Sequence, residues 1–386
     1  MAGSRLSSVE MIEKLVAFDT TSRDSNLALI EFVRDYLDRW RVKSELVYDS
    51  ERRKANLFAT IGPLEVGGVM LSGHSDVVPV AGQDWSSDPF AIVERDGRLY
   101  GRGSADMKSF IAIALARVPD FLAAPLAIPI HLALTYDEEI GCLGVRTLIA
   151  ALAPRPIKPK LCIIGEPTLM QPVIAHKGKR SLRCHVHGHE THSALADRGV
   201  NAIETAAELV AYLKGMARQK RQKGPFDPAF DPPYTTIHTG LIEGGTALNI
   251  VPRECRFDFE MRFLPEDDPD AAIDELKRYA ATLLPEMHAV SAEASIALAE
   301  INAVPALSAK ADDEVVQLAV ALSGANAIGK VSFATEGGLF QQGGIPTVIC
   351  GPGSIEQAHK PDEFIAIDQV RKCEAFLDGL IRRVRR

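Results

Sequence analysis

Acidic and histidine side chains follow several apolar segments of this sequence, each close to the point where the segment ends. His74 and Asp76 follow residues 68–73, Asp137, Glu138 and Glu139 follow residues 130–135, Glu166 follows residues 161–165, and a loop with His359 follows residues 347–351. Ligands of α/β proteins gather at the carboxyl ends of the strands, so we expect these side chains to share one sheet edge. Imidazole and carboxylate groups without cysteine suit Zn²⁺ or a similar ion held for catalysis.

Two neighbouring segments add detail to this expected metal site. In His74-Ser75-Asp76 the imidazole can bind a metal while the carboxylate holds its other ring nitrogen. The alternative is a turn with a solvated acid, which the convergence of the other strand ends makes the weaker interpretation. Asp106 lies in the turn GRGSAD, directly before an apolar helical segment, and can join the same edge.

Two further patterns suggest other chemistry. GRGSAD, residues 101–106, begins like a dinucleotide-binding loop, but it lacks the third glycine and places Asp106 where a phosphate would lie. We therefore reject nucleotide binding. In CHVHGHETH, residues 184–192, His185, His187 and His189 recur at the two-residue period of a strand. They could bind a transition metal adventitiously, but an exposed histidine-rich strand is the favoured account.

The patterns around these residues predict an α/β fold with two domains. Apolar runs at 57–62, 68–73, 130–135, 161–166 and 347–351 alternate with helical segments such as 107–118 and 312–323, which indicates a mostly parallel sheet covered by helices. Between them, 181–188, 235–245 and 254–263 alternate polar with apolar residues, as half-exposed antiparallel strands do, beside helices at 201–219 and 268–284. We expect a catalytic domain of residues 1–176 and 304–386, a smaller inserted α+β domain of 177–303, and a long loop at 218–233.

Composition narrows the class of protein. A chain of 386 residues exceeds one ordinary core, and its formal net charge of −8 argues against nucleic acid or an anionic membrane as a partner. No signal peptide and no apolar stretch of membrane-spanning length is predicted. The six cysteines are scattered, most of them in apolar runs, which indicates buried free thiols and a reducing, cytoplasmic location.

The order and spelling of these motifs resemble the M20 family of di-zinc amidohydrolases and peptidases. The matching segments are GHSDVVP (73–79), YGRGSADMKSFIA (100–112), TYDEEIG (135–141), IIGEPT (163–168) and GPGSIEQAHKPDEF (351–364). Further pointers within the family are HKGKRSL (176–182), ADRGVNAIE (196–204) and ATEGG (334–338). Glu190 and Thr191 stand where the family usually has small residues.

The resemblance implies a role for each site residue. It implies that His74 and Glu166 hold one Zn²⁺, that Glu139 and His359 hold the other, and that Asp106 bridges both; Co²⁺ is also possible. Asp76 would orient His74, and Glu138 would be the general base. His192 would reach the partner subunit's site in a homodimer. Asn249 and Arg262 would contact substrate, although Arg262 could instead be a surface arginine at a strand end.

The resemblance also implies a reaction, the hydrolysis of a small N-acyl amino acid. The first expectation is removal of the acetyl group from N2-acetyl-L-ornithine. Succinyl-diaminopimelate, another acyl amino acid or a dipeptide are alternative substrates. A non-catalytic protein on the same fold is disfavoured, since such a protein would be expected to have lost ligands or the base. Adjacent residues point in different directions, so we expect Glu138 and Glu139 to have different roles.

Overall fold

Residues 5–386 are described by a computed structural model, and they form two compact units. The first unit runs from the first described residue to Ala175 and continues through 307–330 and 335–386. The second comprises residues 176–306 and 331–334. The expected insertion at 177–303 lies inside the second unit, which also takes in His176 and residues 304–306 and 331–334.

The first unit is built on a large mixed sheet. Its strand order is β1 (Ser44–Tyr48), β2 (Ala55–Ile61), β6 (Ile130–Thr135), β3 (Val69–His74), β7 (Leu161–Pro167), β15 (Thr347–Gly351), β8 (Val173–His176) and β13 (Leu307–Ser308). The four central strands β6, β3, β7 and β15 are parallel and buried along their whole length, as the unbroken apolar runs predict. The segment around β2 was expected among them, but β2 is antiparallel to both β1 and β6.

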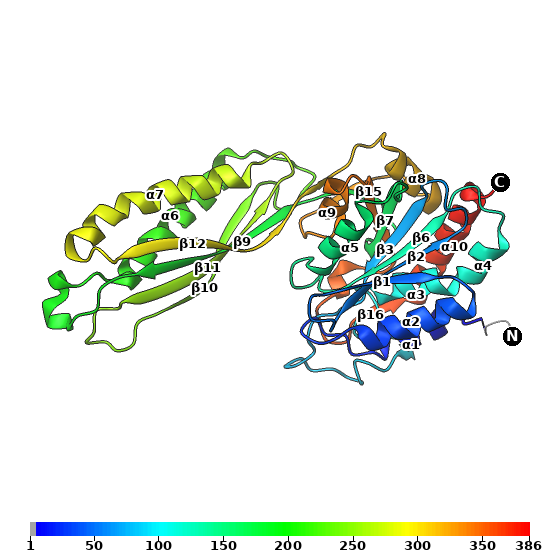
Figure 1. Ribbon diagram of the computed structural model, residues 1–386, viewed down its shortest axis with the longest axis horizontal. Helices are drawn as coiled ribbons and strands as arrows, with labels where there is room; N and C mark the ends of the chain where they lie inside the picture. Colours follow the sequence, from blue (N-terminus) through cyan, green and yellow to red (C-terminus); the bar gives the residue numbers. More distant parts are fainter. Residues whose placement is uncertain (1–4) are drawn as a thin grey trace. The chain divides into compact units, whose positions relative to one another are not determined.

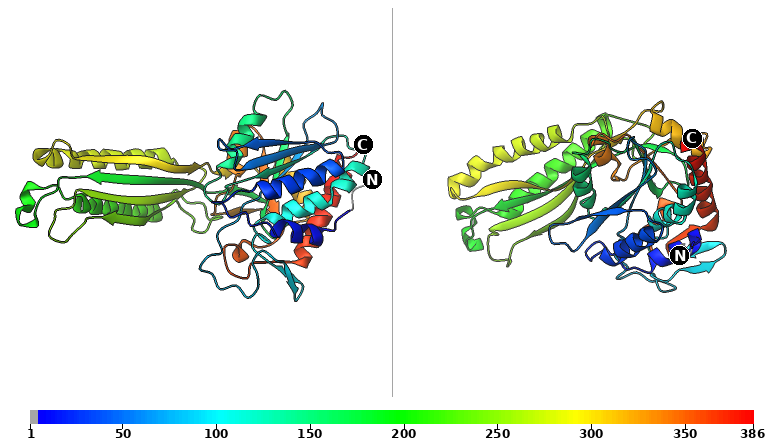
Figure 2. Two further views of the ribbon diagram at one scale, coloured as in Figure 1. Left: turned by 60° about the horizontal axis from the view of Figure 1, so that its bottom comes forward. Right: turned by 45° about the vertical axis from the view of Figure 1, so that its right-hand side comes forward.

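The helices of this unit pack on the sheet or on one another, as Figures 1 and 2 show. They are α1 (Ser8–Val16), α2 (Leu27–Arg39), α3 (Lys108–Ala116), α4 (Val118–Ala123), α5 (Gly144–Leu152), α8 (Glu314–Ser323), α9 (Gly337–Gln342) and α10 (Ile367–Val384). Helix α3 packs on β3 and β7 at unusually short range. A Cβ built on Gly165 of β7 would lie 1.9 Å from the Phe110 ring of α3. Only glycine therefore permits this approach, which places the start of α3 beside the end of β7.

Short elements complete the first unit. They are the sheet of β16 (Phe364–Ala366), β5 (Arg98–Tyr100) and β4 (Val93–Arg95), the strand β14 (Gly329–Val331) and the 3-10 turn at Ile355–Gln357. Pairing of β16 with β5 brings the chain after His359 next to the turn that precedes α3. The sequence patterns did not predict this small sheet, nor helices α5 and α10.

The second unit is a half-exposed antiparallel sheet with two long helices on one face (Figures 1 and 2). Its strand order is β10 (Thr236–Gly244), β11 (Glu254–Phe263), β9 (Gly178–His187) and β12 (Ser295–Val304), and its helices are α6 (Ala202–Lys223) and α7 (Pro269–Val290). Burial alternates along β9 and β11, so Cys184, Val186 and Phe257 pack into one core with α6 and α7 while the neighbouring residues face solvent. The predicted alternation is confirmed for β9 and β11, whereas β10 is exposed along most of its length.

The expected loop at 218–233 is partly wrong. Helix α6 continues to Lys223 and ends at Gly224, whose φ of 72° suits a residue without Cβ. The run of Arg, Gln and Lys that suggests a charged loop consists of good helix formers. Three of its basic side chains lie in the last turn, where they interact favourably with the negative end of the helix dipole. Turns occupy the remainder of the segment.

All six cysteines are buried and free, as their apolar surroundings predict. No helix within residues 5–386 has the length and apolar character that crossing a membrane requires.

His131 gives this fold a testable pH dependence. Its ring stacks on Phe58 and its Nδ1 lies 2.9 Å from Thr60 Oγ1, while Nε2 is buried without a partner. Burial, with a smaller contribution from Arg155, lowers the pKa of His131 to about 4. The unfolded chain therefore binds the proton first, near the ordinary pKa of about 6.5, and stability falls as the pH drops from that value towards 4.

His131→Leu removes this titration. Between pH 7 and pH 5 the wild-type chain should lose about 2 kcal/mol more unfolding free energy than the variant, as measured by urea denaturation at both pH values. Equal losses in both proteins would show that His131 titrates normally in the folded state.

Candidate metal centre at the carboxyl edge of the sheet

Two imidazole–carboxylate pairs meet at one aspartate in the first unit. His74, the last residue of β3, places Nε2 3.0 Å from Asp106 Oδ1 and 3.8 Å from Glu166 Oε1. His359 places Nε2 3.0 Å from Glu139 Oε2 and 3.4 Å from Asp106 Oδ2. The two oxygens of Asp106 thus face two different imidazoles. This is the arrangement required of a carboxylate that bridges two cations.

The donor set fits divalent metal ions. Ligand atoms of His74, Asp106 and Glu139 lie within 4.8 Å of one another, and so do those of His74, Glu138 and Glu166. His74 Nδ1 lies 2.9 Å from the backbone oxygen of Asp76, which can only accept, so Nδ1 carries a proton and Nε2 is left to bind a cation. Nitrogen and oxygen donors without cysteine suit Zn²⁺ or Co²⁺.

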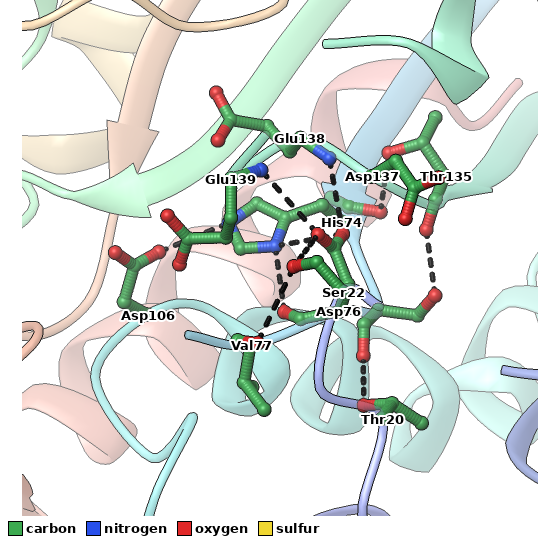
Figure 3. A network of polar contacts seen from close by, with 12 residues as sticks. Thr20, Ser22, His74, Asp76, Val77, Asp106, Thr135, Asp137, Glu138 and Glu139 are labelled. Atoms are coloured by element: carbon green, nitrogen blue, oxygen red, sulfur yellow. Dashed lines mark hydrogen bonds and ion pairs between the residues drawn. The ribbon is translucent and has the colours of Figure 1, made fainter. Parts of the chain in front are cut away.

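Asp76 supports both the imidazole and the acidic turn. Its carboxylate lies 3.5 Å from His74 Nδ1, accepts a hydrogen bond from Ser22 Oγ at 2.7 Å, and accepts the backbone N–H groups of Glu138 and Glu139 at 3.2 and 3.3 Å (Figure 3). The sequence suggested only the first of these contacts. A carboxylate that holds two successive amides fixes the direction of the turn that carries both glutamates.

Asp137 is a structural acid in this geometry. Its carboxylate pairs with Lys54 Nζ at 2.5 Å, and the same ammonium donates to the backbone oxygen of Ser22. Asp137 has a φ of 55°, a left-handed conformation that aspartate tolerates better than most residues. Lys54 therefore neutralises the one acid of the turn that takes no part in the cluster.

The two glutamates of the turn point in different directions. In Figure 3 the Glu139 side chain extends towards Asp106, whereas the Glu138 side chain extends away from it. Glu138 still has a carboxylate oxygen in the neighbourhood of His74 and Glu166. Distances alone thus permit Glu138 to be either a ligand or a neighbouring base, and the sequence-based separation of roles stays a prediction.

The pKa values of the acidic side chains in the cluster are shifted in different directions. Burial raises the pKa of Glu166 well above its usual range, with Asp106 as the next cause. The pKa values of Glu138 and Glu139 are also raised, mainly by burial. The pKa of Asp106 is instead lowered, because contacts with His359 and His74 outweigh its burial. Burial and mutual repulsion thus make the carboxyl groups of Glu138, Glu139 and Glu166 costly to ionise unless a cation is bound among them, a property of sites that take up metal ions.

Several residues that support this centre carried no clear sequence signal. They are Ser22, Lys54, Arg102 and Glu363, of which the last two are almost completely buried. Glu363 lies in the quoted segment GPGSIEQAHKPDEF, but nothing in its spacing distinguishes it from a surface acid. Only the folded chain shows that these charged side chains face inwards.

The other predicted site residues belong to the second unit. His192 and Asn249 lie side by side there, since His192 bridges Ile250 and the Ser193 N–H donates to the Asn249 carbonyl oxygen at 3.0 Å. Both side chains are exposed. Arg262 lies near the end of β11 and pairs with Glu260 at 2.6 Å. Their roles towards a substrate remain predictions.

The histidine-rich strand has an internal explanation. His185 and His187 contact opposite oxygens of the Glu254 carboxylate, at 2.8 and 2.7 Å, on the exposed side of the sheet. Within residues 5–386, the groups with metal-type spacing both include His74 and neither includes these histidines. We therefore keep the interpretation that these histidines lie on the exposed face of a strand.

Comparisons with known proteins agree with this geometry. The model of peptidase family M20/M25/M40 matches residues 70–383. The chain is 35% identical to acetylornithine deacetylase of Pasteurella multocida over 381 residues, which is 97% of each chain. Its fold is similar to an aminopeptidase of Bacillus cereus (TM-score 0.74, 22% identity, 98% of both chains) and to a dinuclear metal-binding M20 peptidase of Bacillus subtilis (TM-score 0.63, 15% identity, 98% and 97% of the chains).

The pair of Lys54 and Asp137 provides a test of how the acidic turn is held. The two side chains are only 12% and 10% exposed, so Lys54→Met would leave a buried, unpaired carboxylate. We expect a loss of about 3 kcal/mol in unfolding free energy. Lys54→Met combined with Asp137→Asn should recover most of it, measured as a double-mutant cycle by chemical denaturation. A double variant no more stable than Lys54→Met would refute the pairing.

Proposed function

We propose that this chain, which belongs to peptidase family M20/M25/M40, is a metal-dependent deacetylase of N2-acetyl-L-ornithine. The reaction would consume one water and release acetate and L-ornithine. The observation that carries the proposal is Asp106, whose two carboxylate oxygens face His74 and His359. The relatives named acetylornithine deacetylase support the substrate, since one of them matches the chain over almost its whole length.

Two Zn²⁺ or Co²⁺ ions would be held by the cluster. His74 and Glu166 would bind one ion, Glu139 and His359 would bind the other, and Asp106 would contact both. Such a pair supplies a Lewis acid for the amide carbonyl and lowers the pKa of a water between them. The dinuclear metal site of the structurally similar Bacillus subtilis peptidase supports this proposal.

Glu138 would act as the general base. Its backbone N–H is held by Asp76 and its side chain does not extend towards Asp106, so it can take up a proton beside the ligands (Figure 3). It would accept a proton from the attacking water and then deliver that proton to the amine that leaves.

The second unit would supply the remaining substrate contacts. We propose that the chain forms a homodimer in the cytoplasm, in which His192 stabilises the oxyanion in the partner subunit's site. Arg262, with its planar fork of donors, would bind the substrate carboxylate, and Asn249 would add a hydrogen bond. The exposure of His192 and Asn249, on adjoining backbone segments, supports a shared role towards a ligand.

A substrate panel tests the proposed activity. N2-acetyl-L-ornithine should be hydrolysed with the highest kcat/KM, ahead of succinyl-diaminopimelate, other acetyl amino acids and dipeptides. Treatment with a chelator should remove about two ions per chain and abolish turnover, and Zn²⁺ or Co²⁺ should restore it. A preference for the succinyl substrate would move the assignment to desuccinylation, and turnover of the fully chelated chain would refute metal dependence.

The assignment of separate roles to the adjacent glutamates is tested by a matched pair of variants. Glu138→Gln should lower kcat by about 100- to 10,000-fold and leave the metal content at two ions, because only proton transfer is lost. Glu139→Gln should lower the metal content as well, because a ligand is lost. Metal analysis beside steady-state kinetics separates them. Loss of metal in Glu138→Gln would make Glu138 a ligand rather than the base.

A further inference from the structure

Glu363 binds the turn that carries Asp106 through four hydrogen bonds. Its Oε1 accepts the backbone N–H groups of Ala105 and Asp106 at 2.8 and 3.0 Å. Its Oε2 accepts the backbone N–H of Gly103 at 3.0 Å and the Arg102 guanidinium at 2.7 Å. Both oxygens are thus fully engaged with one short segment of backbone. The turn cannot rotate without breaking several of these bonds together.

The same network reaches the backbone of His359. Arg102 also donates from Nη2 to Gln83 Oε1 at 2.6 Å, and Gln83 Nε2 donates to the backbone oxygen of His359 at 2.9 Å. In addition, the Gly101 N–H donates to the backbone oxygen of Glu363 at 2.9 Å. The loop with His359 and the turn with Asp106 are therefore joined on both sides of Glu363.

The network is buried, so its charges must be compensated within the protein. The side chains of Arg102 and Glu363 are each only 1% exposed, and their charges compensate one another out of water. Burial raises the pKa of Glu363, but Arg102 and the backbone N–H groups of Asp106 and Gly103 oppose this rise. The Glu363 carboxylate is therefore a buried, charge-paired group with both oxygens bonded to the Asp106 turn, unlike an ion pair at the surface.

We infer that Glu363 is a positioning residue that sets the separation of Asp106 and His359, and through them the affinity for the metal ion that both would hold. The inference rests on the proposed metal centre and adds a function for a residue outside it. Glu363 touches none of the reacting groups and acts through the backbone of the Asp106 turn and the loop of His359.

The test is a calorimetric titration of Zn²⁺ into the chelator-treated full chain. The wild-type chain should take up two ions. Glu363→Gln keeps the size of the side chain but replaces one acceptor oxygen with a donor that opposes an N–H or guanidinium group. It should weaken Zn²⁺ uptake by about 10- to 100-fold, most strongly for the ion that Asp106 and His359 would both hold, the range typical of residues that orient metal ligands.

Two further variants separate positioning from general stability. Gln83→Ala removes only the link to His359, at a half-buried site, and should weaken the same ion by a smaller factor while the other ion binds normally. The Gln83→Ala variant also tests the inference if Glu363→Gln does not fold. Phe376→Leu, in the core of α10, is the control, because it should lower the melting temperature without changing either affinity.

The outcomes are distinct. Zn²⁺ affinities within twofold of wild type in Glu363→Gln and Gln83→Ala would overturn the inference while leaving the metal centre intact. An equal loss of affinity in Phe376→Leu would show that the effect is only destabilisation, and would also overturn it. A wild-type chain that takes up no Zn²⁺ would refute the proposed function itself, and with it the site that Glu363 is inferred to position.

Discussion

The crowding of carboxylates at the carboxyl edge of the parallel strands is the constraint on which the rest of the first unit depends. Asp106, Glu139 and Glu166 converge on His74 and His359 within hydrogen-bonding or near-contact distances. Like charges at such distances repel, and burial strengthens the repulsion by removing water. A chain that keeps these acids together must fix their backbone by other interactions and must leave room for positive charge.

The backbone is fixed by acids that are not themselves among the proposed metal ligands. Asp76 holds the amides of the 138–139 turn, and Glu363 holds those of the 103–106 turn. Arg102 compensates the negative charge of Glu363, and Lys54 compensates that of Asp137. The structure thus contains two classes of acid. One class is structural and is held by cationic side chains or backbone amides, and the other is crowded and buried at the sheet edge, where a divalent metal ion would relieve its repulsion.

The separation into two units assigns different tasks to different segments. The metal-type ligands all come from the first unit, whose buried parallel strands and close α3 packing hold the ligand-bearing ends. The exposed side chains of His192 and Asn249 lie on a half-solvated antiparallel sheet unit.

The sequence by itself determined the strand ends, the type of ligand and the α/β class. Those features follow from local patterns, since an unbroken apolar run predicts a buried strand and a polar residue after it predicts a side chain at the sheet edge. The end of α6 and the antiparallel direction of β2 escaped prediction, because charged helices resemble loops and strand direction depends on distant partners. Only the tertiary structure decided that Asp106 lies between two imidazoles, and that Glu363, Arg102 and Lys54 face inwards. A local pattern cannot specify such contacts, because each joins residues far apart in the chain.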